Sequence, residues 1–289
     1  MKNIVPAVLS IIIGFSVSLF ALNNYSGESL IKSGTKATKK TETTKKTKPS
    51  SKKKSKETSK DVNLNDIQGS FDNWNTYTKK NIDLMSTFIP IDEKGAKTGK
   101  AIFLNSLRTG AYIPIKSEVK GKTQYKLTNL EKSTDGKIRK SIMGKANVAY
   151  QYFKREGKKL PKYDFVDLKG NSHNKADTKD KILVLKCWFI NCKVCVEEFP
   201  QLNALVDKYK DDNIEFVSLA FDEKDKLVEF LKTKSFKYAT VPEQKKYMSK
   251  KLKVKQYPTH LIVDSDGVIL KMVNNVKTLT SELELIMNK

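Results

Sequence analysis

The feature that most constrains this chain is a pair of cysteines three positions apart, Cys192 and Cys195, within the stretch KCWFINCKVCVEEFP at positions 186–200. The apolar run at 182–188 precedes the pair and predicts a buried strand. The residues that follow show an apolar stripe at helical spacing, which predicts a helix: Val196, Phe199, Leu202, Leu205, Val206 and Tyr209. The pair is therefore expected where a strand ends and a helix begins.

This position favours thiolate chemistry. A cysteine at a helix N-terminus faces unpaired backbone N–H groups and the positive end of the helix dipole, and both stabilise the thiolate. Thiols in such settings have pKa values of roughly 3.5–7.5 instead of ~8.5. We expect Cys192 to be the attacking thiolate and Cys195 to resolve the mixed disulfide. Lys193 lowers the pKa further if it leans over the sulfur, and a solvated lysine is the alternative.

Two other interpretations of the pair are weaker. A zinc site needs two more ligands, but the remaining candidates, Cys187, His173 and His260, are not closely spaced with one another. A structural disulfide or two inert buried thiols are the second alternative. The strand–CxxC–helix context favours a redox-active dithiol. We expect no metal and no cofactor other than the redox-active disulfide itself.

The positive charge of the chain is concentrated outside the predicted fold. The 289 residues carry a net charge of +23, and positions 32–60 alone hold twelve lysines and two glutamates. This Lys/Thr/Ser-rich run has no aromatic residues and no helical period. A solvated, disordered linker over 23–63 is therefore expected, and nucleic acid is not a predicted partner.

An uncharged run of nineteen residues, 4–22, opens the chain. It is about long enough to cross a bilayer as a helix, which needs ~20 residues. Because no small-x-small cleavage site follows, 1–22 is predicted to be an uncleaved signal anchor, with a cleaved signal peptide as the alternative. The charge rule opposes an outward-facing body, because only Lys2 precedes the span and four lysines soon follow it: Lys32, Lys36, Lys39 and Lys40.

Residues 64–157 are predicted to form a small α+β domain of unknown role. Short strands are expected at 101–104, 111–115 and 124–127, with a turn at 119–121. A helix is expected from Ile138 to Phe153, with Gly157 at its C-cap. We find no catalytic constellation here.

Residues 158–289 alternate strand and helix, which predicts an α/β fold with a mixed sheet and helices on its faces. The sequence Asp264-Ser-Asp-Gly267 predicts the turn of a hairpin. Strands are expected at 163–168, 182–188, 214–220, 259–263 and 268–273, and helices at 195–209, 222–232, 243–252 and 278–287.

This order resembles the thioredoxin fold, and its details resemble the TlpA/ResA-like branch of membrane-tethered, extracytoplasmic thiol–disulfide oxidoreductases. The resemblance covers about 161–289. It is carried by Phe165-Val-Asp-Leu-Lys-Gly170, Trp188, Cys192-x-x-Cys195 with Glu198-Phe-Pro200, Tyr257-Pro258-Thr259 and Leu261-Ile-Val-Asp264-x-x-Gly267. The middle domain is loosely similar to N-terminal segments of Bacteroidota relatives.

The resemblance implies specific roles. Pro258 is expected to be cis and to face the CxxC motif, and Glu198 is expected to be the active-site acid near the second cysteine, where it could accept the Cys195 proton. Substrate contacts are expected from Tyr257, Pro258, Trp188 and Lys193. An extracytoplasmic, periplasmic body, protein thiol or disulfide clients and an upstream redox donor are also implied. From the residues alone, Cys187 in the buried strand is interpreted as a packing residue and His260 as a structural residue.

The sequence also departs from the pattern of this branch. Asn191 replaces the usual Trp before the first cysteine, and Val194 replaces a common Pro. Lys253 and Gln256 stand where glycines are frequent ahead of the proline. These differences bear on redox potential and partner choice, and leave the reaction class intact.

Two rival functions remain open. A thiol peroxidase of the same fold carries Pro and Thr ahead of its reactive cysteine, at the positions of Leu185 and Phe189 here. A redox-inactive, surface-tethered binding module is the non-enzyme rival. Peroxide consumption separates the first from a disulfide oxidoreductase, and cycling of the two thiols separates the second.

Overall fold

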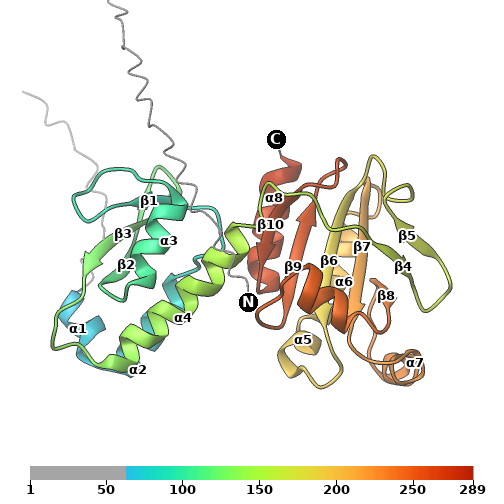
Figure 1. Cartoon of the computed structure of the whole chain (residues 1–289), viewed down its shortest axis with the longest axis horizontal. Coiled ribbons are helices and arrows are strands. Elements are labelled where there is room, and N and C mark those ends of the chain that lie inside the picture. Colours follow the sequence, from blue (N-terminus) through green and yellow to red (C-terminus); the bar gives the residue numbers. More distant parts are fainter. Residues whose placement is uncertain (1–62, 289) are drawn as a thin grey trace, which may run out of the picture. The chain divides into compact units, whose positions relative to one another are not determined.

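The computed structural model describes residues 63–288, which lie in one compact unit (Figure 1). The predicted signal anchor, 1–22, and nearly all of the predicted linker, 23–63, lie outside the described residues. Among residues 63–288, every helix is too short or too polar to cross a bilayer.

Residues 63–157 form a three-stranded sheet with helices against it. The strand order is β1-β3-β2, with β1 parallel and β2 antiparallel to β3. The elements are α1 (Leu64–Gly69), α2 (Phe71–Asn81), β1 (Ile89–Ile91), α3 (Lys100–Arg108), β2 (Tyr112–Val119), β3 (Lys122–Asn129) and α4 (Gly136–Phe153).

The strands predicted at 111–115 and 124–127 fall within β2 and β3, and the turn at 119–121 joins them. The strand predicted at 101–104 is wrong, because these residues lie in helix α3. Phe103 and Leu104 are fully buried while Ile102 is 63% exposed, a helical pattern that four consecutive apolar residues do not reveal. Helix α4 ends at Phe153 with Lys154 as its C-cap, so Gly157 lies beyond the cap.

The remaining residues form the thioredoxin-like α/β fold. Its central sheet has the order β10-β9-β6-β7-β8, in which β6, β7 and β8 are parallel and β9 and β10 run antiparallel to their neighbours. The strands are β6 (Ile182–Trp188), β7 (Ile214–Ala220), β8 (Ala239–Val241), β9 (Thr259–Val263) and β10 (Ile269–Val273). A separate hairpin pairs β4 (Asp164–Val166) with β5 (Ser172–Asn174).

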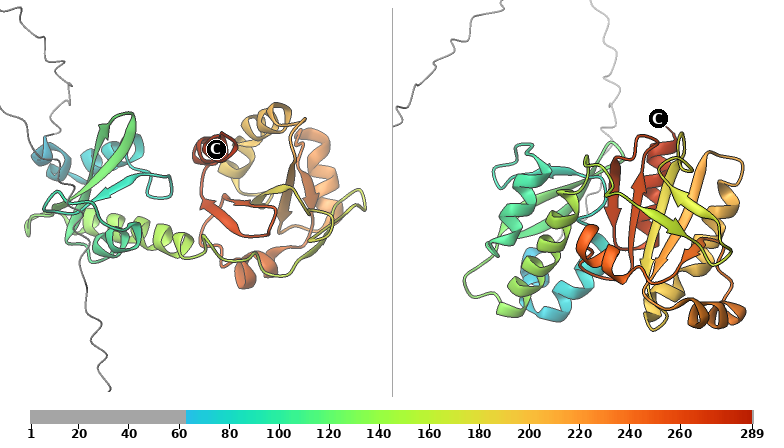
Figure 2. Two further views of the ribbon diagram at one scale, coloured as in Figure 1. Left: turned by 90° about the horizontal axis from the view of Figure 1, so that it is seen from above. Right: turned by 45° about the vertical axis from the view of Figure 1, so that its right-hand side comes forward.

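Helices cover this sheet (Figure 2). They are α5 (Lys193–Glu197), α6 (Phe199–Lys208), α7 (Lys224–Thr233), the π-helical turn η1 (Tyr247–Lys251) and α8 (Val276–Met287). Helices α6 and α8 contact each other, and α8 also packs on β9 and β10. The sheet and these helices place the end of β6 and the start of α5 at one edge of the molecule.

Most predicted elements of this part are confirmed, including β6, β7 and the β9–β10 hairpin. The helix predicted at 195–209 is divided into α5 and α6 at Glu198, directly before Phe199 and Pro200. The helix predicted at 243–252 is shorter and contains the π-helical turn η1. The sequence pattern missed the short strands β5 and β8.

Candidate functional site

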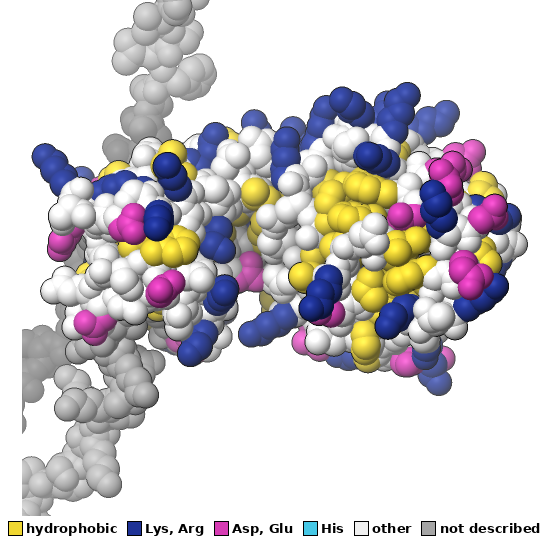
Figure 3. Space-filling model, turned by 90° about the horizontal axis from the view of Figure 1, so that it is seen from below, with side chains coloured by type: hydrophobic (Ala, Val, Ile, Leu, Met, Phe, Trp, Pro, Cys, Tyr) yellow, Lys and Arg dark blue, Asp and Glu magenta, His cyan; other side chains and the backbone are white. Residues whose placement is uncertain are grey.

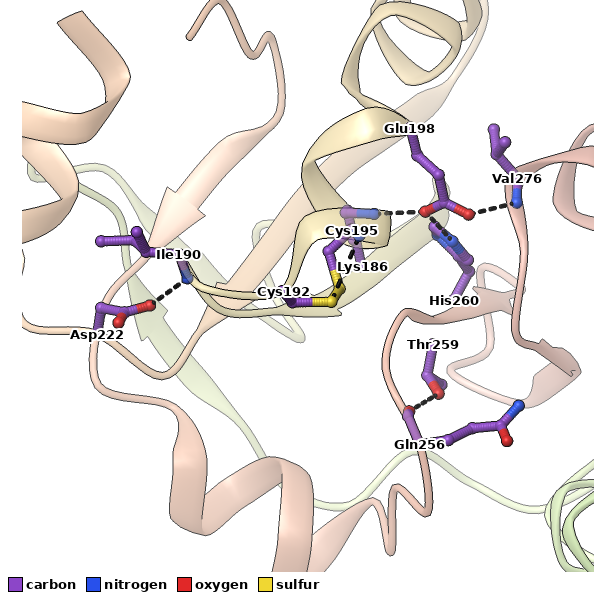
Figure 4. Close-up of a disulfide and its surroundings, with 10 residues drawn as sticks. All are labelled: Lys186, Ile190, Cys192, Cys195, Glu198, Asp222, Gln256, Thr259, His260 and Val276. Carbon is purple, nitrogen blue, oxygen red and sulfur yellow. Dashed lines mark hydrogen bonds and ion pairs between the residues drawn. A yellow bond between two sulfur atoms is a disulfide. The ribbon is translucent and has the colours of Figure 1, made fainter. Parts of the chain in front are cut away.

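Cys192 and Cys195 form a disulfide at the start of α5 (Figure 4). Cys192 is the N-cap residue of this helix, and its Sγ accepts a hydrogen bond from the backbone N–H of Cys195 at 3.3 Å. Cys192 is 9% exposed and Cys195 is 0% exposed. The first sulfur is therefore the one that an incoming thiol can reach.

The loop between β6 and α5 is held by two hydrogen bonds. The backbone N–H of Cys192 donates to the carbonyl of Phe189 at 3.0 Å. The backbone N–H of Ile190 donates to the carboxylate of Asp222, which follows β7, at 2.9 Å. Because β6 and β7 are parallel neighbours, their carboxyl ends bring these two loops together. The sheet thus fixes the approach to the disulfide.

Trp188 is the last residue of β6 and contacts an aromatic cluster. Its ring is 5.0 Å from that of Phe199 and 5.9 Å from that of Phe236, centroid to centroid. Trp188 is 0% exposed, so the predicted substrate-binding role does not fit its position. The indole instead belongs to the buried cluster that also contains both cysteines.

The peptide bond between Tyr257 and Pro258 is cis, as the resemblance implied, and Pro258 is buried. Tyr257 packs against the cluster that contains both cysteines. Its ring is 5.6 Å from Phe189 and 4.9 Å from Phe221, and each pair meets at a steep angle. These partly exposed rings offer an apolar contact surface at the reactive sulfur.

Figure 3 views the molecule from the side on which α5 lies, and hydrophobic side chains gather there over the thioredoxin-like part. Near the disulfide, Val194 is 56% exposed, and Phe189 and Ile190 are only partly buried. Lysine and arginine side chains lie at the margins of this apolar area.

Lys193 does not lean over the sulfur. Its side chain is 88% exposed, and its ammonium lies 3.8 Å from the carboxylate of Glu197. The solvated alternative, weighed from the sequence, is the one that the structure favours.

Glu198 is the centre of a buried ionic cluster behind the disulfide, which we call the Glu198 cluster: Lys186, Glu198 and His260. The ammonium of Lys186 donates to Oε2 of Glu198 at 2.7 Å, and Nε2 of His260 lies 3.1 Å from the same oxygen. The backbone N–H of Val276 donates to Oε1 at 2.9 Å (Figure 4). Lys186 and His260 are 0% exposed and Glu198 is 6% exposed.

Electrostatics hold this cluster in one protonation state. Burial raises the pKa of Glu198, but the hydrogen bond of His260 and the charge of Lys186 outweigh it and hold the pKa at about 2. Burial and the Lys186 charge lower the pKa of His260. A neutral His260 that donates from Nε2 to the carboxylate satisfies both directions. The Nδ1 atom of His260 has no hydrogen-bond partner among the described residues.

The sequence pointed to Glu198 but missed its partners. Both oxygens of Glu198 are occupied by Lys186, His260 and Val276, and a carboxylate of such low pKa is a weak proton acceptor. A signal for Lys186 was present, because a lysine inside an otherwise apolar strand must find a counter-charge. His260 was interpreted as structural, and the structure places it in contact with the predicted acid.

Cys187 precedes Trp188 in β6 and is completely buried. Burial raises the pKa of its thiol far above the usual range, which keeps it protonated and unreactive. Within residues 63–288, no three or more His, Cys, Asp or Glu side chains gather in a way that could bind a metal ion.

Comparison with known proteins agrees with this geometry. Residues 157–272 match the model of the AhpC/TSA family. The chain is 31% identical to the thiol-disulfide oxidoreductase ResA of Bacillus cereus over 133 residues, which cover 44% of this chain and 77% of the relative. It is 30% identical to the thioredoxin-like protein YneN of Bacillus subtilis over 118 residues, 40% of this chain and 69% of that protein.

Two solved structures are also similar. The thioredoxin domain of a thiol-disulfide oxidoreductase from Bacteroides vulgatus has a TM-score of 0.42 and 23% identity, covering 45% of this chain and 96% of its own. A putative thiol:disulfide interchange protein DsbE from Chlorobium tepidum has a TM-score of 0.42 and 20% identity, covering 46% and 96%.

The fold, the CxxC disulfide and the cis proline define a thioredoxin-fold protein. The match to ResA, which spans more than two thirds of that relative, is decisive for the family. The chain belongs to the TlpA/ResA-like thioredoxin family and is a thiol–disulfide oxidoreductase.

Proposed function

We propose that this protein is an extracytoplasmic oxidoreductase that exchanges a dithiol for a disulfide with protein clients through Cys192 and Cys195. The observation that carries the proposal is the disulfide at the start of α5, with one accessible and one buried sulfur. An accessible first thiol and a buried second thiol match the division between attack and resolution.

In the oxidised protein, a client thiolate attacks Sγ of Cys192, the Cys192–Cys195 bond breaks, and Cys195 leaves as a thiolate. A second client thiolate then attacks the client sulfur of the mixed disulfide. The client becomes a disulfide, and the protein becomes a dithiol. In the reverse direction, the Cys192 thiolate attacks a client disulfide and Cys195 displaces the client. Both directions use the same two sulfurs, and each transfers two electrons and two protons between the client and the protein.

The partly exposed rings of Tyr257, Phe189 and Phe221 would hold the client chain beside Cys192, and the cis Tyr257–Pro258 segment would present its backbone to that chain. Pro258 has no N–H, so its backbone does not compete for a ladder hydrogen bond with an extended client. The Glu198 cluster would change the stability of the Cys195 thiolate. We propose that Glu198 keeps Lys186 charged and in place, so that the ammonium stabilises the departing Cys195 thiolate.

The test uses two cysteine variants of the full chain. Cys195→Ala should accumulate mixed disulfides with clients, because Cys192 can attack and nothing resolves the product. Cys192→Ala should accumulate none. Purified mixed disulfides would be released with dithiothreitol and the attached proteins identified. If the two variants trap the same amount of protein, or if neither thiol cycles in the wild type, the proposal fails.

The match to the AhpC/TSA model keeps a thiol peroxidase as the second candidate. Leu185 and Phe189 occupy the positions where such enzymes carry Pro and Thr. Phe189 is engaged with Phe221 and Tyr257. We therefore expect no consumption of hydrogen peroxide above that of the Cys192→Ala variant, measured with dithiothreitol as reductant. Turnover that depends on Cys192 would favour the peroxidase.

We propose that residues 4–22 anchor the chain in a membrane and that the thioredoxin-like part faces away from the cytoplasm. The nineteen uncharged residues and the family resemblance support this arrangement, while the lysines after the run oppose it. Protease treatment of spheroplasts should remove 61–289 from cells. A fully protected body would mean that the lysines set the topology.

A further inference from the structure

A pocket of about 480 Å³ lies between the end of α2, the β2–β3 sheet, α4 and the loops before β9 and α8. Its lining is rich in lysine, and all of these lysines lie within the single compact unit. They are Lys79, Lys80, Lys116, Lys145 and Lys277. The pocket is not part of the disulfide chemistry described above.

The positive charge of this pocket is not balanced from within. Asp83 is the one carboxylate that lines it. Its Oδ1 accepts from the backbone N–H of Met85 at 3.0 Å, and its Oδ2 accepts from the hydroxyl of Thr278. Among the pocket lysines, Lys116 pairs with Glu118 at 3.0 Å, and the other four have no acidic partner within 4.0 Å in the described part of the chain. Clustered like charges of this kind attract anionic groups.

Two loops connect the pocket to the disulfide. Gln256 lines the pocket and directly precedes Tyr257 and Pro258. Asn275 also lines the pocket, and the next residue, Val276, donates to Glu198 behind Cys195. Figure 4 shows the backbone N–H of Val276 donating to Glu198, and it shows Gln256 on the segment that leads to Thr259 and His260. The segment that carries Tyr257 therefore also contributes to the lining of the pocket.

We propose that this lysine-lined pocket binds acidic side chains of the client protein whose cysteine reacts with Cys192. The proposal rests on the proposed client exchange and adds the charge of the substrate to it. The apolar surface beside the disulfide holds the residues next to the client cysteine, and the pocket holds aspartate or glutamate residues farther along the client chain. The neutral polar groups in the lining, such as Gln256 and Asn275, can donate to the same carboxylates.

The experiment compares three synthetic peptides that share one intramolecular disulfide. One peptide has four glutamates before the disulfide, one has four glutamates after it, and one has four glutamines at both places. The reduced protein is mixed with each peptide, and the rate of peptide reduction is followed by acid quenching and chromatography. One acidic peptide should react roughly fivefold faster than the neutral peptide at low salt. This preference should shrink in 0.5 M NaCl, because salt screens exposed charges.

Matched variants locate the effect. In Lys145→Gln/Lys277→Gln, the ratio of acidic to neutral rates should fall close to one. In the control Lys132→Gln/Lys179→Gln, the chain loses the same charge at two exposed lysines that do not line the pocket, and the ratio should be unchanged. Dividing by the neutral-peptide rate removes any general loss of exchange or of folded protein.

The outcomes separate the pocket from the chemistry. Equal rates for all three peptides, or an equal loss of preference in both double variants, would overturn the pocket proposal and leave the exchange function standing. If no peptide is reduced at all, while thiol titration shows the protein dithiol to be intact, the exchange function itself fails.

Discussion

Two histidine–carboxylate–lysine clusters in the thioredoxin-like part use the same residue types in different surroundings. The Glu198 cluster lies behind the disulfide, and Lys186 and His260 are completely buried. The second, which we call the Asp167 cluster, consists of Asp167, His173, Glu215 and Lys181. His173 lies between the two carboxylates, and Lys181 pairs with Glu215 at 2.9 Å with 41% of its side chain exposed.

The two clusters also differ in position on the sheet. Glu215 lies at the start of β7, opposite Leu183, whereas Lys186 lies farther along β6, toward Cys192. Asp167 accepts from the backbone N–H groups of Lys169 at 2.9 Å and Asn171 at 2.8 Å, so it fixes the β4–β5 turn. The Asp167 cluster therefore stabilises the β4–β5 hairpin, while the Glu198 cluster places the buried ion pair of Lys186 and Glu198 behind the disulfide. Asp167 and His173 are buried like Glu198 and His260, and the clearest difference is the lysine, which is completely buried for Lys186 and 41% exposed for Lys181.

The largest expected difference between the clusters is in stability. Lys186→Met should lower the free energy of unfolding by about 3–5 kcal/mol, because it leaves the buried Glu198 carboxylate without its counter-charge. Lys181→Met, at the exposed edge of the other cluster, should cost less than about 1 kcal/mol. Chemical denaturation of the oxidised proteins measures both. A double variant, Lys186→Met/Glu198→Gln, should recover much of the loss, and equal costs for the two single variants would erase the distinction.

Acid should affect the Glu198 cluster next most strongly. The folded-state pKa of Glu198, about 2, lies below the ordinary value of 4.5. Its stabilisation is therefore fully present above about pH 4.5 and is lost as the pH falls through about 2, and it amounts to at most about 3 kcal/mol. Between pH 6 and pH 2.5, wild type should lose more stability than Glu198→Gln. Parallel pH profiles of the two proteins, measured by denaturation, would contradict the low pKa.

The sequence revealed those parts of the site that depend on neighbours along the chain. The apolar run before Cys192 and the Asp264–Gly267 turn are local patterns and are confirmed. The stripe after Cys195 is helical as predicted, but it is divided into two helices at Glu198. The Glu198 cluster is not local, because Glu198 is twelve residues from Lys186 and sixty-two from His260 along the chain. Periodicity carries no information about such pairings, which only the sheet register of β6 and β9 creates.

The pocket lysines were hidden for the same reason. Lys79, Lys145 and Lys277 belong to three helices or their flanks, and a lysine on a helix surface ordinarily indicates solvent. The misassigned strand at 101–104 shows the complementary limit, because a run of four apolar residues fits a strand and a helix equally well. The tertiary neighbours of this run determine that it is a helix. Helix α3 packs on α4, β1 and β2, and the sequence pattern does not show these contacts.

A smaller effect is expected on the rate of disulfide exchange, where the adjacent residues Glu197 and Glu198 can be compared. Glu198→Gln should slow disulfide exchange by about tenfold, because Lys186 loses the partner that positions its charge. Glu197→Gln should leave the rate unchanged, since Glu197 is 58% exposed and its one ion-pair partner among the described residues is Lys193. Exchange rates of the two variants with a model disulfide, measured from pH 6 to pH 9, test this difference. If both variants match wild type, Glu198 has no part in the reaction.

The smallest effect on reactivity is expected at the solvent-exposed pair of Lys193 and Glu197, in contrast to the buried ions of the Glu198 cluster. The Lys193 side chain is 88% exposed and its ammonium lies 3.8 Å from Glu197, so water and salt screen its charge from the Cys192 sulfur. Lys193→Gln should change the rate of Cys192 alkylation in the reduced protein by less than about twofold, because exposed pairs contribute less than about 1 kcal/mol. Lys232→Gln, at a similar exposed pair with Glu229, serves as the control and should have no effect. The measurement is iodoacetamide reactivity against pH at low and high salt. A loss of more than about fivefold that disappears at high salt would show that Lys193 acts on the sulfur through its charge, despite its exposure.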